Sequence, residues 1–463
     1  MLFSSLEFLY VFLPITVFIY FLLPAAPAWR NTALLVFSIV FYIYGEVKLL
    51  WVMLLCVAAN YLFGILLDFV CPRYKKAVLV LAVAFNIALL AIFKYTDFIL
   101  DSAGLSPIGI ALPLGISFYV FQAMSYVLDV YRGEARVQRN IISFGTYVMM
   151  FPQLVAGPIV RYSDIERELY ERGRKISLEN VSEGLRIFTV GLCKKVIFAN
   201  RAGEIREIFL ASGDGYISVL GEWAALILYA FQIYYDFGGY SDMAVGLGRI
   251  FGFSFPKNFN YPYVARSITD FWRRWHITLS SWFREYVYIS LGGNRCARGR
   301  VIFNLFVTWA LTGIWHGAAW NFVLWGLYFF LILLAEKTFL RKVLDRLPTA
   351  FCHIYALFFI LLGWLVFTSE DGQGLIRLGR LFGIGVDSFA DGFAVYELVR
   401  HGLIISLMAV GATPAARAVS EKLKNAYPTV WEIAVNILAP AGVILSTAAL
   451  VGSSYNPFLY FRF

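Results

Sequence analysis

Long, continuous apolar runs recur along this chain, and they limit what it can fold into. Residues 5–24 form one such run, in which Glu7 is the only charged residue. A helix needs roughly 20 apolar residues to cross a bilayer. Charged residues make up only 15% of the chain, whereas a soluble domain carries about 25%. The runs therefore predict an all-α polytopic membrane protein with about ten to twelve transmembrane helices, and their continuity excludes a β-barrel.

The short basic loops between these runs predict which side of the membrane each loop faces. Lys and Arg are enriched in cytoplasmic loops. Arg73, Lys75 and Lys76 lie in one such loop, so we place it in the cytoplasm. Counting spans from there leaves the polar link at residues 94–104 outside and Arg132 inside. The first five predicted spans are residues 5–24, 31–45, 49–70, 77–93 and a stretch within 107–130.

The middle of the chain departs from simple spans. Residues 143–162 are apolar but interrupted by prolines and a glycine, which predicts a re-entrant segment buried against other helices. The charge-rich residues 161–182 predict a cytoplasmic insertion. Residues 183–200 predict an amphipathic interfacial helix with Lys194 and Lys195 at the headgroups. Further spans are expected near residues 217–237, 301–316, 320–335, 350–368, 401–412 and 432–452, and the C-terminal helices at 350–463 complete a single membrane domain over residues 1–463.

Several other classes of protein do not fit this sequence. The net charge of +9 comes from Lys and Arg in short loops, so the chain lacks the basic soluble face that binds nucleic acid. The five cysteines are scattered without a CxxC or CxH pair, so we expect neither a disulfide framework nor a metal site. Before Arg30 only Glu7 is charged, so we expect no cleavable signal peptide.

Residues 271–289 are basic and aromatic with a helical period. The pattern predicts an amphipathic helix at the membrane interface. Its plain interpretation is a surface anchor whose arginines touch headgroup phosphates. Alternatively, Arg273, Arg274 and Arg284 bind an anionic ligand, and bidentate guanidinium contacts would suit a phosphate-bearing molecule such as coenzyme A. The predicted membrane face holds Phe271, Trp275, Thr278, Trp282, Tyr286 and Ile289, and the opposite face holds Arg273, His276, Ser280 and Arg284.

His316 is the most informative single residue. Basic loops at 295–300 and 336–346 are both predicted to be cytoplasmic, and two apolar runs lie between them. His316 follows Arg300 by a helix rise of roughly 24 Å, which places it deep in the membrane or near its far face. An ionisable group there is costly, so a functional role is the favoured hypothesis over a neutral core histidine. Gly313 and Gly317 flank it and permit close approach of the backbone.

The other titratable candidates carry weaker signals. His276 is either a second catalytic group or a phosphate-binding interfacial residue, and His353 and His401 are expected to be ordinary interfacial histidines. Asp236 and Asp242 are flanked by aromatic residues and glycines. Each carboxylate could orient a histidine and raise its basicity, or cap a break in a helix. The sequence leaves both alternatives open.

Five segments together resemble the membrane-bound O-acyltransferases, and in particular the bacterial alginate O-acetylase branch. That branch also acetylates peptidoglycan and other exopolysaccharides, and a more distant cousin transfers D-alanine to teichoic acid. The motif core covers residues 107–335. The segments are PLGISFYVFQAMSYVLDVYRG from residue 113, FPQLVAGPIVRY from residue 151, YYDFGGYSDMAVGLG from residue 234, FWRRWHITLSSWFREYVYISLGGNR from residue 271, and WHG from residue 315.

This resemblance implies a fold and an activity. The fold would be a ring of membrane helices around a central tunnel, and His316 would be the essential histidine, with His276 at the family's other histidine position. The activity would move acetyl from cytoplasmic acetyl-CoA, without a metal, to hydroxyls of a polysaccharide outside the bacterial inner membrane. Transfer would be direct or through a secreted SGNH-type acetyltransferase, and D-alanyl transfer is the alternative within the family.

Two other functions compete with acyl transfer. A transporter or flippase for a polysaccharide or lipid-linked unit could use a buried histidine for proton coupling, although the chain shows no inverted repeat. A scaffold for a partner acetyltransferase would not need His316. Within the acyltransferase hypothesis, we expect His276 on a surface helix at donor entry and His316 a leaflet or more beyond it. The two histidines would then not form a dyad.

Overall fold

The secondary structure is helical, as the apolar runs predict. The computed structural model describes residues 1–170, 174, 176–211, 218–369, 372–453 and 455–459. Within these residues the β-type pairing is limited to an isolated bridge between Ser218 and Ser388. The described chain forms two units. Unit 1 comprises Met1–Phe188 and Tyr240–Lys257, and unit 2 comprises Thr189–Gly239 and Asn258–Leu459.

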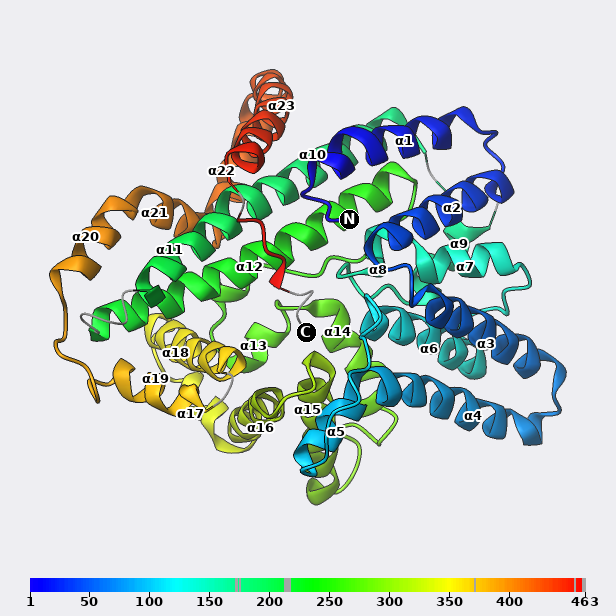
Figure 1. Ribbon diagram of the computed structural model, residues 1–463, viewed down its shortest axis with the longest axis horizontal. Helices are drawn as coiled ribbons and strands as arrows, with labels where there is room; N and C mark the ends of the chain where they lie inside the picture. Colours follow the sequence, from blue (N-terminus) through cyan, green and yellow to red (C-terminus); the bar gives the residue numbers. More distant parts are fainter. Residues whose placement is uncertain (171–173, 175, 212–217, 370–371, 454, 460–463) are drawn as a thin grey trace. The chain divides into compact units, whose positions relative to one another are not determined.

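Unit 1 packs its helices around α6 (Ile116–Arg132), whose residues 116–127 are all buried. α3 (Leu50–Phe69) and α4 (Pro72–Leu90) run side by side in Figure 1. The amides of Asn60 and Asn86 bond each other across these two helices at 2.7 and 3.0 Å, which satisfies both groups in an apolar setting. The other helices with residues in unit 1 are η1 (Phe8–Phe12), α1 (Leu13–Leu22), α2 (Pro27–Gly45), η2 (Ala91–Tyr95), α5 (Thr96–Ser102), α7 (Ile141–Met149), α8 (Phe151–Leu154), α9 (Tyr162–Leu169), α10 (Leu178–Cys193) and α12 (Val219–Ile250), of which α10 and α12 continue into unit 2.

The segment predicted to be re-entrant is a broken, buried stretch of chain. Every residue from 143 to 160 is buried. The helix α7 ends before Met150, α8 adds one short turn, and non-helical chain follows. The hydroxyl of Tyr147 donates to the carbonyl of Val160 at 3.1 Å, and this bond satisfies one backbone group outside the helices. The prediction of a buried, broken segment is confirmed.

The polar link predicted at residues 94–104 is mostly helix instead. The chain continues from α4 through η2 into α5, so that Pro72–Ser102 forms one candidate span. Lys94 is buried, and its ammonium donates to the Ser117 hydroxyl at 2.9 Å. The hydrogen bond to Ser117 satisfies the buried Lys94 ammonium, so this charge can lie within a helix that continues to Ser102. The prediction that a span ends before Lys94 and a polar link follows it is therefore wrong.

Five helical segments in the described part of the chain are long and apolar enough to cross a membrane, and a bent pair of helices gives a sixth. This number is below the expected ten to twelve. Phe8–Leu22 is shorter than a span, and the predicted spans at 217–237 and 301–316 lie in Val219–Ile250 and Arg298–His316, which are long enough but are not apolar enough to be candidate spans. An all-α, multi-pass membrane protein is confirmed. The candidate spans are Leu50–Phe69, Pro72–Ser102, Trp320–Leu344, Thr349–Thr368 and Pro428–Gly452, with the bent pair Gly392–Arg400 and Gly402–Gly411.

Unit 2 contains a close helical hairpin of α15 (Arg298–His316) and α16 (Trp320–Ala335). α18 (Thr349–Thr368) packs on α16, and the Asn321 amide donates to the Phe367 carbonyl at 2.8 Å. The remaining helices of unit 2 are η3 (Lys194–Ala199), α11 (Asn200–Ala211), η4 (Pro262–Val264), α13 (Ile268–Trp272), α14 (Ile277–Phe283), η5 (Arg284–Tyr288), η6 (Glu336–Leu340), α17 (Arg341–Leu344), α19 (Gln373–Leu381), α20 (Gly392–Arg400), α21 (Gly402–Gly411), α22 (Ala415–Ala426) and α23 (Pro428–Gly452).

The hairpin depends on Gly313, and replacing it should destabilise the protein. A Cβ atom at Gly313 would lie 2.5 Å from the Phe322 carbonyl oxygen. We expect Gly313→Ala to lower the free energy of unfolding by about 1–3 kcal/mol, because α15 and α16 must separate. Gly299→Ala is the matched control, because a Cβ atom there meets nothing within 4 Å. Thermal unfolding in detergent measures both variants, and equal stability would contradict the close contact.

Candidate functional site

His276 lies at a break in the chain and not on a continuous helix. The structure replaces the helix predicted at 271–289 with α13, α14 and η5, so that prediction is wrong. His276 has a φ of 44°, in the left-handed region, which costs a residue with a Cβ atom roughly 1–2 kcal/mol. A hydrophobic period cannot reveal such a break. The predicted membrane face is still buried at Phe271, Trp275, Thr278, Trp282 and Tyr286, whereas Ile289 is exposed.

Asn258 holds the buried imidazole of His276. The Asn258 side-chain oxygen accepts hydrogen bonds from the backbone N–H and the hydroxyl of Thr278, at 3.3 and 2.9 Å. The same oxygen lies 3.1 Å from Nδ1 of His276. Because that oxygen is an acceptor, Nδ1 donates, and the neutral ring carries its lone pair on Nε2. His276 is fully buried and not part of an exposed cationic face.

The electrostatic surroundings also favour a neutral His276. The Phe237 ring meets the imidazole edge-on at a centroid distance of 4.7 Å. Burial lowers the pKa of His276 well below its usual range, and the nearby His316 lowers this pKa further. The His276 ring is therefore neutral, with its lone pair on Nε2, and the same burial disfavours the imidazolium that proton transfer would form.

His316 is the last residue of α15 and is buried among aromatic rings. Its ring centroid lies 4.8 Å from that of Trp325 and 5.5 Å from that of Phe367, both with edge-on geometry. The helix α15 begins at Arg298, in the basic loop, so its full length separates those cations from His316. The depth of His316 in the membrane stays a prediction, because α15 is not among the candidate spans of the described residues.

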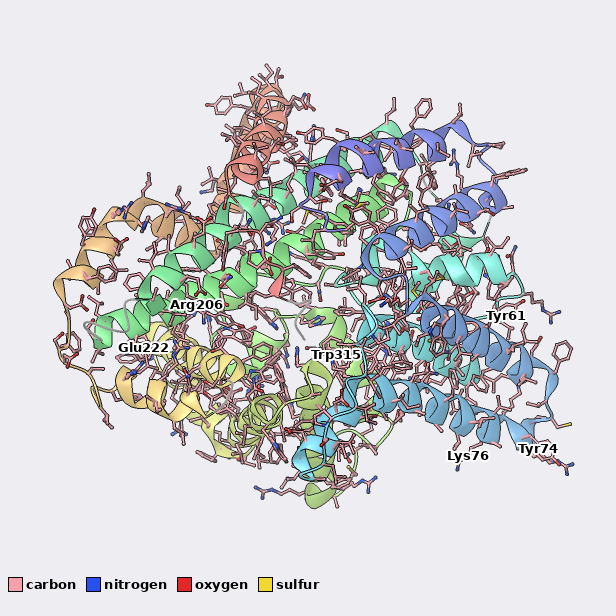
Figure 2. All side chains as sticks on the ribbon, in the orientation of Figure 1. Tyr61, Tyr74, Lys76, Arg206, Glu222 and Trp315 are labelled. Carbon is pink, nitrogen blue, oxygen red and sulfur yellow. The ribbon has the colours of Figure 1, made fainter. Side chains whose placement is uncertain are left out.

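The two histidines belong to one cluster, which we call the histidine cluster: His276, His316, Trp315, Trp325 and Phe367. Trp315, which is labelled in Figure 2, contacts the His276 ring at a centroid distance of 5.8 Å and the His316 ring at 5.1 Å. The expected separation by a leaflet is therefore wrong. It assumed that His276 lies on the exposed side of a regular helix, whereas the left-handed break places it in the core.

The three arginines proposed for the donor lie outside this cluster. Arg273 and Arg284 are exposed. The Arg274 guanidinium is already engaged by the Asp270 carboxylate at 2.8 Å. Within four residues the chain thus passes from the exposed Arg273 to the buried His276.

Asp236 does not orient a histidine, so that alternative is wrong. Its carboxylate forms a buried ion pair with Lys195 at 2.9 Å and accepts the Leu459 backbone N–H at 2.8 Å. The interfacial helix was predicted to place Lys195 at the headgroups. This prediction is wrong, because Lys195 is buried. Sequence analysis did not predict this ion pair, because Lys195 and Asp236 are distant along the chain and each was assigned a different role. Asp242 is partly exposed in the part of α12 that belongs to unit 1.

The other two histidines, His353 and His401, each lie beside an oxygen atom of another residue. Nδ1 of His353 lies 3.0 Å from the Ala265 carbonyl oxygen, and Nε2 of His401 lies 3.2 Å from the Glu397 carboxylate. His401 is buried, which the interfacial prediction did not anticipate. Within the part of the chain that the structure describes, no group of three His, Cys, Asp or Glu side chains could hold a metal ion.

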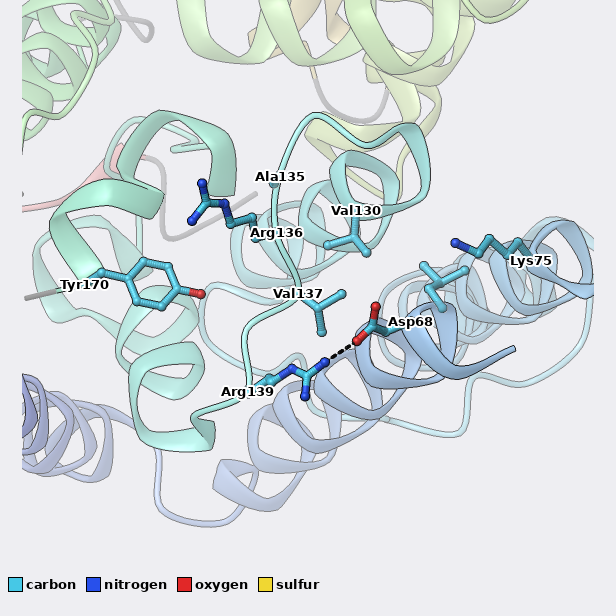
Figure 3. Close-up of a pocket in the computed structure, with 9 residues that line it drawn as sticks. Asp68, Lys75, Val130, Ala135, Arg136, Val137, Arg139 and Tyr170 are labelled. Carbon is cyan, nitrogen blue, oxygen red and sulfur yellow. Dashed lines mark hydrogen bonds and ion pairs between the residues drawn. The ribbon is translucent and has the colours of Figure 1, made fainter. Parts of the chain in front are cut away.

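Unit 1 has a polar cavity of its own, with a volume of about 490 Å³ (Figure 3). Lys75, Arg136 and Arg139 line it, and Arg139 bonds Asp68 at 2.6 Å. The cavity belongs to unit 1 and the histidine cluster to unit 2, so we do not assign the two to one site.

Comparison with known proteins places the whole chain in a family of enzymes. Residues 34–370 match the membrane-bound O-acyltransferase family, MBOAT. The chain is 36% identical to the probable alginate O-acetylase AlgI of Pseudomonas putida, with all of both chains covered. It is 33% identical to the peptidoglycan O-acetyltransferase of Helicobacter pylori, over 82% of this chain and 79% of that protein. The teichoic acid D-alanyltransferase of Bacillus subtilis is 26% identical over 56% of this chain and 69% of its own length. The chain that buries two histidines in one aromatic cluster is thus a multi-pass membrane enzyme, and it belongs to the membrane-bound O-acyltransferase family.

Proposed function

We propose that this protein moves an acetyl group from cytoplasmic acetyl-CoA to a hydroxyl of a polysaccharide on the outer side of a bacterial inner membrane. The observation that carries the proposal is the histidine cluster, which buries two imidazoles among aromatic rings. Full-length similarity to a probable alginate O-acetylase favours acetyl as the group and a polysaccharide as the acceptor. Transfer of D-alanine to teichoic acid is the alternative within the family.

His316 acts as the general base in this proposal. The acceptor oxygen attacks the thioester carbonyl as His316 removes the hydroxyl proton. The carbon–sulfur bond then breaks, and the leaving thiolate takes the proton from the His316 imidazolium, which returns His316 to its neutral form. His276 is the second candidate for proton transfer, because Asn258 fixes its tautomer with the lone pair on Nε2. Arg273 and Arg284 are exposed near His276 in sequence and would meet the phosphates of the donor outside the buried cluster. Arg274 would have to exchange its bond to Asp270 to join them.

Trp325 is a candidate donor to the oxyanion that forms during the attack. Its side chain is completely buried against His316, and its indole nitrogen has no acceptor among the described residues. We expect Trp325→Phe to lower kcat by about 10²–10³-fold, the usual effect of losing one oxyanion donor. Trp309→Phe is the matched control, because Trp309 contacts Trp325 but lies outside the histidine cluster. Equal transfer rates for these two variants would contradict the assignment.

Replacing Asn258 with aspartate should change the pH dependence of transfer. In the natural protein, the lowered pKa of His276 keeps this ring neutral near neutral pH, so titration of His276 should not limit the transfer rate there. A carboxylate facing Nδ1 stabilises the imidazolium, so Asn258→Asp should raise this pKa. Activity should then fall as the pH falls through neutrality. Asn258→Ala removes the hydrogen bond without adding charge and should not show this acid limb. Superimposable profiles for Asn258→Asp and the natural protein would exclude His276 from proton transfer.

Thioester consumption separates the competing functions. Purified protein is supplied with acetyl-CoA and a deacetylated polysaccharide, and free thiol is measured together with ester formed on the glycan. An O-acetyltransferase releases one thiol for each ester. A transporter consumes no thioester, and a scaffold forms ester only when a partner acetyltransferase is added. If a secreted SGNH-type partner relays the acetyl group, thiol release will require that partner in place of the polysaccharide.

A further inference from the structure

Unit 2 contains a cavity with a volume of about 340 Å³ that is lined by three arginines, and we call it the arginine cavity. Arg206 reaches it from α11, and Arg377 and Arg380 reach it from α19. Two carboxylates, Glu222 and Asp391, also line it. Figure 2 labels Arg206 and Glu222, which lie close together. None of these residues belongs to the histidine cluster, and the proposed mechanism uses none of them.

The carboxylates of this cavity are largely engaged by other groups. Glu222 pairs with Nε of Arg377 at 2.5 Å. Asp391 accepts the Ser218 hydroxyl and, at 2.7 Å, the Ala394 backbone N–H. For Arg380, the described residues provide no carboxylate within ion-pair distance.

Arg206 is another cation of this cavity, and its side chain is mostly buried. It meets Glu207 at 3.2 Å, and its guanidinium lies 5.1 Å from the Tyr229 ring centroid. Burial lowers the pKa of Arg206, and repulsion from Arg377 lowers it further. The cavity therefore favours an anion that can bind Arg380 and relieve the repulsion between the other arginines.

The cavity adjoins the histidine cluster through α18. Thr368 lines the cavity, and the preceding residue, Phe367, contacts the His316 ring. α18 is a candidate span that ends at Thr368 and begins after the basic residues 336–346, which form η6, α17 and the end of the preceding candidate span. The positive-inside rule places these basic residues on the cytoplasmic side, so the cavity lies at the outer end of α18. An acceptor outside the cell would approach His316 from this end.

The side chains that line the arginine cavity suit a sugar acid better than a lipid. Thr368, Gln373 and Ser218 place hydroxyl and amide groups beside the arginines, which suits the hydroxyls and the carboxylate of an acidic sugar. A different cavity of unit 2, of about 700 Å³, is lined by aliphatic side chains that suit an acyl chain, including Leu403, Leu407 and Leu445. The volume of the arginine cavity falls within the range of small-molecule sites, about 300–1,000 Å³.

We propose that the arginine cavity binds a carboxylate of an acidic saccharide and so positions the acceptor for transfer. The proposal rests on the proposed function for the nature of the acceptor. It concerns binding alone, so it is tested without any acyl donor.

The test is equilibrium binding of an unbranched uronic-acid hexasaccharide to the purified full-length protein, with a neutral hexasaccharide as the second probe. We expect the acidic probe to bind more tightly and to weaken as salt is raised. Arg380→Gln should raise its Kd by about 10- to 100-fold, because a hydrogen bond to a charged group is lost. Arg380→Lys should lose less, because it keeps the charge without the bidentate geometry. Arg417→Gln is the matched control, since Arg417 is exposed and pairs with Glu421 on α22.

Three results would overturn the proposal. The first is equal binding of the acidic and neutral probes by the natural protein, which requires no variant to fold. The second is an unchanged Kd for Arg380→Gln. The third is that Arg380→Gln weakens binding to anionic phospholipid vesicles but not to the acidic saccharide, which would make the cavity a lipid site. Because no thioester is present, a failed transfer assay leaves these outcomes unaffected.

Discussion

His316→Gln is expected to lower acyl transfer by about 10²–10⁴-fold, the range for loss of a general base. His316 is buried between Trp325 and Phe367, and neither indole nor phenyl can accept the proton of the attacking hydroxyl. Glutamine keeps a polar side chain of similar length, so the cavity is not emptied. The rate of ester formation per folded protein molecule measures the effect.

The matched control for this prediction is His353→Gln. His353 faces the Ala265 carbonyl and is not part of the histidine cluster, so its loss should leave the transfer rate within about twofold of the natural protein. Gel filtration and thermal unfolding of both variants report whether each one folds. A folded His316→Gln protein that transfers at the rate of His353→Gln would show that His316 is not the base.

Asp236→Asn should lower the free energy of unfolding by about 3–5 kcal/mol, the usual effect of removing one partner of a buried ion pair. Lys195 and Asp236 are each only 2% exposed and lie 2.9 Å apart. Without the carboxylate, the Lys195 ammonium keeps neutral partners, such as the Asn200 side-chain oxygen at 2.7 Å. The Leu459 N–H also loses its carboxylate acceptor, so the C-terminal segment at 455–459 should detach more easily.

Chemical unfolding in detergent measures this loss, and protease accessibility of the C-terminal segment reports its release. Asp345→Asn is the matched control, because Asp345 pairs with Arg341 at 3.8 Å while 69% exposed. The double change Lys195→Met with Asp236→Leu removes both charges and should regain most of the stability. If Asp236→Asn were as stable as Asp345→Asn, the buried pair would not hold this region together.

Hydrophobic patterning predicted the class of fold and much of the burial. It identified the all-α membrane architecture and the broken segment at 143–160, because proline and glycine interrupt a run that is too apolar to be exposed. It also placed Phe271, Trp275 and Trp282 on a buried face. These features depend on local composition and period, which a single sequence displays.

The geometry of the candidate site depends on contacts that a single sequence does not display. The inward position of His276 results from a left-handed residue that Asn258 supports from outside the predicted helix. Lys195 was predicted at a headgroup and Asp236 beside a histidine or a helix break, whereas the structure pairs the two. Trp325 and Phe367 resembled ordinary core residues, because nothing in a hydrophobic period distinguishes a ring beside a histidine from any other ring.

The central claim is that the histidine cluster transfers an acyl group from a thioester to a hydroxyl. The most direct test reconstitutes the natural protein and His316→Gln at equal density in vesicles, with labelled acetyl-CoA on one side and a deacetylated polysaccharide on the other. The account predicts that label reaches the polysaccharide through the natural protein and is reduced about 10²–10⁴-fold in His316→Gln. Equal labelling by the two proteins, or no thioester consumption by the natural protein with any acceptor or partner, would contradict it.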